Sequence, residues 1–207
     1  MTDVKTRRPY NATLRHEQAQ MTKLRILETA RRRLVDGTYS SVTMEEIARE
    51  AGVSSQTVYG AFGTKLRLVT AMIERGFPHV EEAVKLFDGP RGSGDAEVWL
   101  RTTARVFRLI HEPCADLLRF MAESGDPVLQ HQHQEIDASR LKRLREVAEE
   151  IAQSGRLRPG MSGAEALDVL WVMTGPDCYR KFVFQRGWAP SKFEEWLGQT
   201  LVDILLE

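Results

Sequence analysis

The sequence lacks the features of several large classes of protein. Its 207 residues include two cysteines, Cys114 and Cys178, too few and too far apart for a zinc site or a disulfide scaffold. We expect both to be buried apolar residues in a reducing compartment. Apolar runs stay below the roughly 18 residues that cross a bilayer, and the basic first twenty residues lack the apolar segment of a signal peptide. These absences predict a cytoplasmic protein that does not enter a membrane.

Catalytic and cofactor motifs are also missing. The chain contains no GxSxG, HExxH, P-loop or dinucleotide-binding glycine pattern. We therefore expect no enzyme activity, no cofactor and no metal site. No segment shows the alternating pattern of a β-strand, and apolar residues recur at helical spacing almost throughout, so the predicted fold class is all-α, with about nine helices.

The net charge is zero, with 29 basic and 29 acidic residues, but the charges are unevenly distributed. Residues 1–67 carry 12 Lys/Arg and 7 Asp/Glu, whereas residues 68–207 carry 17 and 22. A basic end on an otherwise acidic chain is expected when that end faces a polyanion such as DNA. Chance asymmetry explains the charges equally well.

The basic segment contains the signals of several short helices. A first apolar stripe ends at Asp36–Gly37, and Thr43 with Glu46 forms a capping box that opens a second helix. Gly52 ends that helix, and Ser54 caps a third. Two short helices joined by a glycine turn form a helix-turn-helix, whose second helix fits the major groove of B-DNA. Gln56 on this helix is the expected base reader.

The segment from about residue 24 to 70 resembles the DNA-binding domain of the tetracycline-repressor (TetR) family of bacterial regulators. The matching positions are Ile26, Leu27, Ala30, Thr43, Ile47, Ala48, Ala51, Gly52, Val53, Ser54, Thr57, Val58, Tyr59, Phe62, Lys65 and Leu68. The C-terminal segment beginning at Leu167 is also similar to a common pattern of this family. The resemblance implies a flexible basic arm (1–20), a three-helix DNA-binding domain (21–67) and a larger helical ligand-binding and dimerisation domain (68–207).

The resemblance places DNA contacts on and beside the third helix. The residues are Thr43, Ser54, Ser55, Gln56, Thr57, Tyr59 and Lys65. Free N–H groups at helix N-termini bind phosphate, and the charge of Lys65 adds to that attraction. Thr43 is expected to cap its helix as well. The alternative for Tyr59 is packing in the core, with its hydroxyl exposed.

Gly60 and Ala61 depart from the family pattern, because many members carry a basic or bulky residue there. Specificity for the DNA sequence is then expected to depend on DNA shape or on the basic arm, which would follow the backbone or reach a minor groove. The alternative for the arm is a solvated tail without DNA contacts.

Two further sets of residues are expected to serve the C-terminal domain. Aromatic and polar residues that could line a ligand cavity are Trp99, Phe107, His111, Phe120, Met121 and Trp171. The alternative for each is ordinary core packing. Apolar residues of the last two helices, expected to form a four-helix dimer interface, are Leu167, Phe182, Phe193, Trp196, Leu197, Leu201 and Ile204.

Together these features predict a homodimeric repressor that a small-molecule inducer releases from a palindromic double-stranded DNA operator. An activator or a ligand-independent regulator has the same sequence features, because the position of the operator decides the sign of regulation. A third alternative is a helical protein-interaction adaptor, which would bind duplex DNA no better than other neutral proteins.

Overall fold

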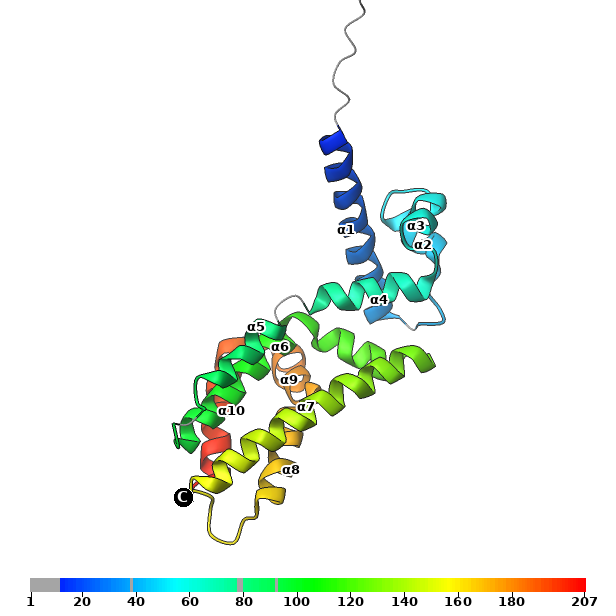
Figure 1. Ribbon diagram of the computed structural model, residues 1–207. Helices are drawn as coiled ribbons and strands as arrows, with labels where there is room; N and C mark the ends of the chain where they lie inside the picture. Colours follow the sequence, from blue (N-terminus) through cyan, green and yellow to red (C-terminus); the bar gives the residue numbers. More distant parts are fainter. Residues whose placement is uncertain (1–11, 38, 78–79, 92) are drawn as a thin grey trace, which may run out of the picture. The chain divides into compact units, whose positions relative to one another are not determined.

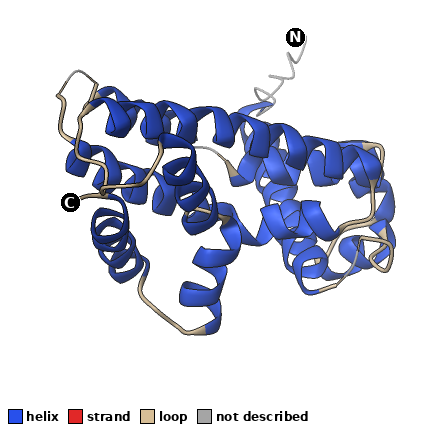
Figure 2. Ribbon diagram, turned by 90° about the horizontal axis from the view of Figure 1, so that it is seen from below, coloured by secondary structure: helices blue, strands red, loops and turns tan. Residues whose placement is uncertain are grey.

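The computed structural model describes residues 12–37, 39–77, 80–91 and 93–207, and the regular structure in these ranges is helical (Figure 1, Figure 2). The prediction of an all-α fold is thus confirmed. The elements are α1 (Ala12–Asp36), α2 (Met44–Glu50), α3 (Ser55–Phe62), α4 (Lys65–Gly76), α5 (Val80–Lys85), the 3₁₀ turn η1 (Leu86–Asp88), α6 (Ala96–Glu123), α7 (Pro127–Gln153), α8 (Gly163–Met173), α9 (Pro176–Tyr179), the π-helical segment η2 (Arg180–Gln185) and α10 (Pro190–Leu205). Within these described ranges, no helix combines the length and the apolar character needed to cross a bilayer.

The chain divides into two compact units between Met72 and Ile73, inside α4. The division falls a few residues after the expected domain boundary at residue 67. The first unit holds α1, α2, α3 and most of α4, and the second holds the remaining helices.

The first unit is built around a small apolar core. Its fully buried side chains come from all of its helices and include Ile26, Leu34, Ile47, Val58 and Leu68. Helix α1 begins at Ala12, so the part of the expected flexible arm from residue 12 to residue 20 is helical. The physical reason is that no glycine or proline interrupts residues 12–36. Residues 1–11, the rest of that arm, lie outside the described residues.

The caps predicted at Thr43 and Ser54 are present, and so is the one that the spacing of Ser162 and Glu165 predicts. The capping boxes of Thr43 with Glu46 and of Ser162 with Glu165 are complete, and the Ser54 side chain accepts a hydrogen bond from the N–H of Thr57. These local signals were readable because capping partners lie three residues apart.

The spacing of Ser191 and Glu194 also predicts a capping box, and this prediction is wrong. Ser191 and Glu194 do not form a capping box, because α10 already begins at Pro190, with Ala189 as its N-cap residue. Proline is favoured at the first helical position, where its missing N–H costs nothing. The Glu194 carboxylate instead pairs with the guanidinium of Arg108 on α6.

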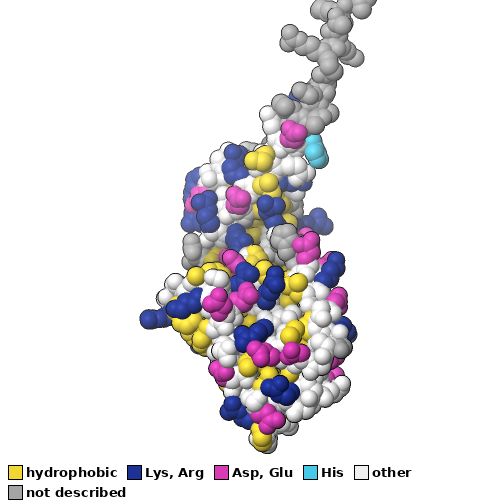
Figure 3. Space-filling model, turned by 90° about the vertical axis from the view of Figure 1, so that its left-hand side faces the viewer, with side chains coloured by type: hydrophobic (Ala, Val, Ile, Leu, Met, Phe, Trp, Pro, Cys, Tyr) yellow, Lys and Arg dark blue, Asp and Glu magenta, His cyan; other side chains and the backbone are white. Residues whose placement is uncertain are grey.

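The second unit is organised around α6, which carries buried side chains along its whole length. Helices α7, α9 and α10 pack against α6, and α8 packs against α7 (Figure 1). Cys114 on α6 is buried as expected, whereas Cys178 on α9 is only half-buried, because its neighbour Tyr179 occupies the inward position. Neither cysteine forms a disulfide. On the face drawn in Figure 3, acidic and basic side chains are interspersed.

Candidate nucleic-acid interface and ligand-binding regions

The turn between α2 and α3 has the geometry of a helix-turn-helix. Gly52 adopts a φ of +65°, which side chains rarely tolerate, and this conformation lets the chain reverse after Ala51. The N–H of Val53 then donates to the carbonyl of Ala48, 3.0 Å away. Ile47 of α2 and Val58 of α3 are both fully buried, so the two helices are held together through their inner faces.

The N-termini of α2 and α3 are both capped by side chains. The N–H of Glu46 donates to the Thr43 hydroxyl over 3.2 Å, and the N–H of Thr43 donates to the Glu46 carboxylate over 3.0 Å. These hydrogen bonds hold the pKa of the Glu46 carboxyl below its ordinary value. Ser54 caps α3 in a similar way, with its oxygen 3.1 Å from the N–H of Thr57. The expectation that Thr43 caps its helix is therefore confirmed.

The outer face of α3 is small and polar. Gln56 and Thr57 are exposed, Ser55 is half-buried, and Val58 faces inward. A Cβ added at Gly60 would meet nothing within 4 Å, so this position presents bare backbone to its surroundings. An eight-residue helix is about 12 Å long, which matches the roughly 12 Å width of the major groove.

Tyr59 belongs to this outer face and not to the core. Its side chain is 44% exposed, which excludes the alternative of core packing. Its hydroxyl donates a hydrogen bond to the carboxylate of Glu45 on α2, at 3.0 Å. That bond raises the pKa of the Tyr59 phenol, so the hydroxyl keeps its proton at neutral pH.

Lys65 lies at the first position of α4 and is half-buried. Its ammonium group donates a hydrogen bond to the backbone carbonyl of Tyr39 and lies 4.4 Å from the centroid of the Tyr39 ring. Burial lowers the pKa of Lys65. The side chain thus connects the start of α4 to the segment between α1 and α2. An ammonium group has three donors, and the Tyr39 carbonyl uses one of them, so two donors remain for other acceptors.

The sequence did not reveal three residues that position this surface. Glu45 orients Tyr59, Tyr39 receives Lys65, and Thr64 accepts a hydrogen bond from the N–H of Arg67 at the start of α4. Thr64 could have been found, since threonine before a helix is a common cap. The contacts of Glu45 and Tyr39 join residues distant in sequence and carry no local signal.

The residues expected to line a ligand cavity are distributed over the second unit. Trp99 and Met121 are 22 positions apart on α6, which is about 33 Å along a helix axis. They therefore cannot line one small cavity. Trp171 is half-buried and stacks on the guanidinium of Arg140, whose central carbon lies 3.5 Å from a Trp171 ring centroid. Phe120 and Met121 are buried near the C-terminal end of α6.

Phe107 and His111 do lie together, one turn apart on α6. Their rings are 3.8 Å apart between centroids, and both side chains are buried. The ring of Tyr179 from α9 lies 6.5 Å from that of Phe107 and 6.2 Å from that of His111. This aromatic group includes Tyr179, which the sequence did not single out.

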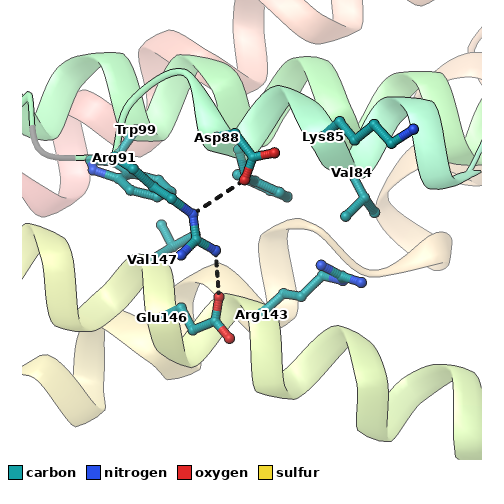
Figure 4. A pocket seen from close by; sticks show the side chains of 9 residues that line it. Val84, Lys85, Asp88, Arg91, Trp99, Arg143, Glu146 and Val147 are labelled. Atoms are coloured by element: carbon teal, nitrogen blue, oxygen red, sulfur yellow. Dashed lines mark hydrogen bonds and ion pairs between the residues drawn. The ribbon is translucent and has the colours of Figure 1, made fainter.

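A shallow cleft of about 80 Å³ lies elsewhere in the second unit, where α5 and η1 meet α6 and α7 (Figure 4). Arg91 extends across it and pairs with Asp88 and Glu146, each over 3.4 Å. Phe87 and Trp99 also line it. Drug-sized ligands occupy about 300–1,000 Å³, so this cleft is too small for such a molecule in the conformation described.

The expected dimer-interface residues fall into two groups. Phe193, Leu197 and Leu201 are completely buried within the unit, on the side of α10 that faces α6, so they offer no surface to a second subunit. The others are half-buried at the edge of the core and are Leu167, Phe182, Trp196 and Ile204. Two other apolar side chains of the same part of the sequence are strongly exposed: the exposed fraction is 68% for Val172 and 52% for Phe184.

Residues 26–72 match the family described as "Bacterial regulatory proteins, tetR family". No curated protein matches the chain. Within the residues that the structure covers, no group of three or more His, Cys, Asp and Glu could hold a metal ion.

Several solved structures share the fold at low sequence identity. NalD from Pseudomonas aeruginosa, described as the secondary repressor of the MexAB-OprM multidrug efflux pump, is 19% identical with a TM-score of 0.62, over 91% of this chain and 98% of that one. A putative transcriptional regulator from Saccharomonospora viridis in complex with choline is 17% identical with a TM-score of 0.65, over 91% and 99%. FadR from Bacillus subtilis in complex with stearoyl-CoA is 16% identical with a TM-score of 0.61, over 87% and 98%. The described fold is therefore shared over nearly the whole length of these regulators.

Proposed function

We propose that this chain, which belongs to the tetR family of bacterial regulatory proteins, is a homodimeric repressor that a small molecule releases from a palindromic DNA operator. The observation that carries the proposal is the polar outer face of α3, held by buried Ile47 and Val58 behind it. A helix of this length with exposed Gln56 and Thr57 can place hydrogen-bonding groups against base edges in the major groove.

The capped N-termini support phosphate binding beside that helix. Thr43, Ser54 and Lys65 lie at the starts of α2, α3 and α4, where backbone N–H groups and the helix dipole favour negative charge. Phosphate contacts fix the position of a protein on DNA, and base contacts provide the sequence specificity.

The exposed apolar side chains of the second unit support dimerisation. Phe184 and Val172 are exposed, and Trp196 and Phe182 are half-buried with ring centroids 4.4 Å apart. An exposed aromatic side chain beside other aromatic rings in the sequence of one segment is consistent with an interface there. A second copy is the natural occupant, because a two-fold dimer presents two recognition helices to the half-sites of a palindrome.

Release by a small molecule is supported by the relatives. Structures of the same fold hold choline in one regulator and stearoyl-CoA in another. A ligand of the present chain would act through its different affinities for the DNA-bound and free arrangements of the dimer. The chain passes from one unit to the other within α4, so a change transmitted along the backbone has to pass through this helix.

The test is DNase I footprinting on the DNA flanking the protein's own gene, since regulators of this kind often control themselves or a neighbour. We expect a protected palindrome whose half-site centres lie about 34–36 Å apart or a multiple of that. Protection overlapping the promoter supports repression, and protection upstream of it supports activation. A folded protein that, in a gel shift at moderate salt, retards duplex DNA no better than other neutral proteins of its size would instead support the adaptor function.

A further inference from the structure

Several buried polar atoms of the second unit have no hydrogen-bond partner among the described residues, and Nε1 of Trp99 and Oε1 of Gln132 belong to this set. Two further members of the set lie on neighbouring rings of the core, 6.2 Å apart between ring centroids. These atoms are Nε2 of His111 and the hydroxyl oxygen of Tyr179. The side chains are 2% and 0% exposed, and they come from different helices, α6 and α9. Because an unpaired buried polar atom costs about 1–3 kcal/mol, such atoms are rare in proteins unless something else binds them.

The hydrogen bond at Nδ1 of His111 determines whether Nε2 carries a proton. Nδ1 lies 2.9 Å from the carbonyl oxygen of Phe107, which only accepts hydrogen bonds, so Nδ1 carries the proton. Burial and the nearby charge of Arg140 lower the pKa of His111 to about 3, and the ring is neutral at physiological pH. Nε2 is therefore unprotonated and can only accept a hydrogen bond, and no donor for it lies among the described residues.

Tyr179 offers the complementary group. Burial raises the pKa of its phenol to about 12, so the hydroxyl remains a donor as well as an acceptor. Aromatic rings surround it: the Phe193 centroid is 5.2 Å from its own and the Phe184 centroid 5.8 Å, both edge-on. The Tyr179 ring is thus packed among other aromatic rings.

The charged groups that act on the two side chains are Arg140 at His111, and Glu112 and Arg108 at Tyr179. Arg108 is paired with Glu112 and Glu194, so these groups do not favour a charged ligand. Arg140 donates to the carbonyl of Trp171 and the hydroxyl of Thr174 and lies 3.4 Å from Asp137, so its charge is already paired. A carboxylate could not donate a hydrogen bond to Nε2, and an ammonium group would be buried beside the charge of Arg140. A neutral hydroxyl can donate to Nε2 and accept from the Tyr179 hydroxyl.

The backbone around Tyr179 is irregular. Helix α9 follows a break at Gly175 and Pro176, and after Tyr179 the chain continues as the π-helical segment η2. Insertions of π-helix occur frequently at functional sites. Segment η2 also carries Phe182 and Phe184, which belong to the proposed dimer surface, so a ligand that moves α9 would also move that surface.

We propose that His111 and Tyr179 form the effector site of this regulator and bind an uncharged hydroxyl compound with an apolar body. This inference rests on the proposed function, since it names the class of effector and the route from the site to the dimer surface. The hydroxyl group of the ligand forms hydrogen bonds with Nε2 of His111 and the hydroxyl of Tyr179, and its apolar body lies against Phe107 and Phe193.

The test uses one tail with three head groups: 1-hexanol, hexanoate and hexylammonium at neutral pH. We expect 1-hexanol to bind saturably and at least about tenfold more tightly than either ion, because burial of an unpaired charge is costly. In protein labelled with ¹⁵N-histidine, the His111 Nε2 resonance should move to the frequency of a hydrogen-bonded acceptor. Tyr179→Phe, which removes one hydroxyl, should weaken hexanol binding about tenfold. His131→Gln, at an exposed histidine of α7, should leave it unchanged.

Several results would overturn the inference. These are equal binding of the ions, an unchanged His111 resonance at saturating hexanol, full affinity in Tyr179→Phe, and an ordered water on both atoms that no alcohol from ethanol to octanol displaces. DNA binding by the same samples separates the two proposals. If the protein binds DNA but not alcohols, the proposed effector site is wrong and the DNA-binding function stands. If it binds hexanol but not DNA, the proposed DNA-binding function is wrong and the binding site stands.

Discussion

The hydroxyl of Tyr59 donates a hydrogen bond to the carboxylate of Glu45, 3.0 Å away, and thereby connects the exposed face of α3 to α2. This bond orients a phenol beside the expected path of the DNA backbone. It also places a negative charge there, where it opposes phosphate binding.

Tyr59→Phe and Glu45→Gln should have opposite effects on DNA binding. The phenylalanine keeps the ring and loses the hydroxyl, so affinity should fall about three- to tenfold, the value of one hydrogen bond. The glutamine keeps an acceptor for Tyr59 and removes the charge, so affinity should rise. Fluorescence anisotropy with the footprinted operator measures both. If neither variant differs from wild type, the outer face of α3 has been misassigned.

Lys65→Ala should alter both stability and DNA binding. Loss of the bond to the Tyr39 carbonyl should lower the free energy of unfolding by about 1 kcal/mol. If the remaining donors of the ammonium reach a phosphate, the slope of log affinity against log salt should decrease in magnitude by about 0.9. Urea unfolding and anisotropy at several salt concentrations measure these effects. Lys85→Ala in the second unit is the matched control. An unchanged salt slope in Lys65→Ala would show that this lysine does not contact a phosphate and serves only to bind the Tyr39 carbonyl.

His111 should make the second unit sensitive to acid. Its pKa is about 3 when folded and about 6.5 when exposed, so protonation favours the unfolded chain. The stabilisation is complete above about pH 6.5 and should decline by up to about 1.4 kcal/mol per pH unit as the pH falls toward 3.

His111→Gln isolates this contribution, because it removes the titrating ring and leaves the carboxyl groups unchanged. Urea unfolding of both proteins between pH 7 and pH 4 should show a steeper loss in the wild type. Parallel curves would mean that His111 is not buried in the neutral form.

Phe184→Glu should weaken the dimer. A carboxylate on the exposed apolar surface would be buried without a partner in a two-fold interface, and this substitution occurs twice in each dimer. Sedimentation at micromolar concentration should show a larger monomer fraction than in wild type. Val128→Glu, at a 46% exposed residue of α7, is the control and should remain dimeric. A wild-type protein that is already monomeric would contradict the proposed assembly.

The helix-turn-helix could be predicted because its signals are local. Thr43 with Glu46, Gly52 and Ser54 act within three or four residues of the groups they satisfy. The contacts of Tyr59 with Glu45 and of Lys65 with Tyr39 depend on how the helices cross, and a single sequence does not specify that.

The second unit shows a different limit. Periodicity reveals that α10 has an apolar stripe but not which neighbour covers each part of it. In the structure Phe193 and Leu197 turn inward to α6, while Trp196 lies at the edge of the core. The same limit explains why His111 could be named from the sequence and its neighbour Tyr179 could not.

Selection from a pool of randomised DNA duplexes, with wild type and Gln56→Ala, decides whether α3 reads base edges in the major groove. If α3 reads the major groove, wild type should enrich one palindromic motif, and Gln56→Ala should relax the preference at one position in each half-site by about 1–3 kcal/mol. A folded, dimeric wild-type protein that enriches no motif would show that α3 does not recognise a DNA sequence.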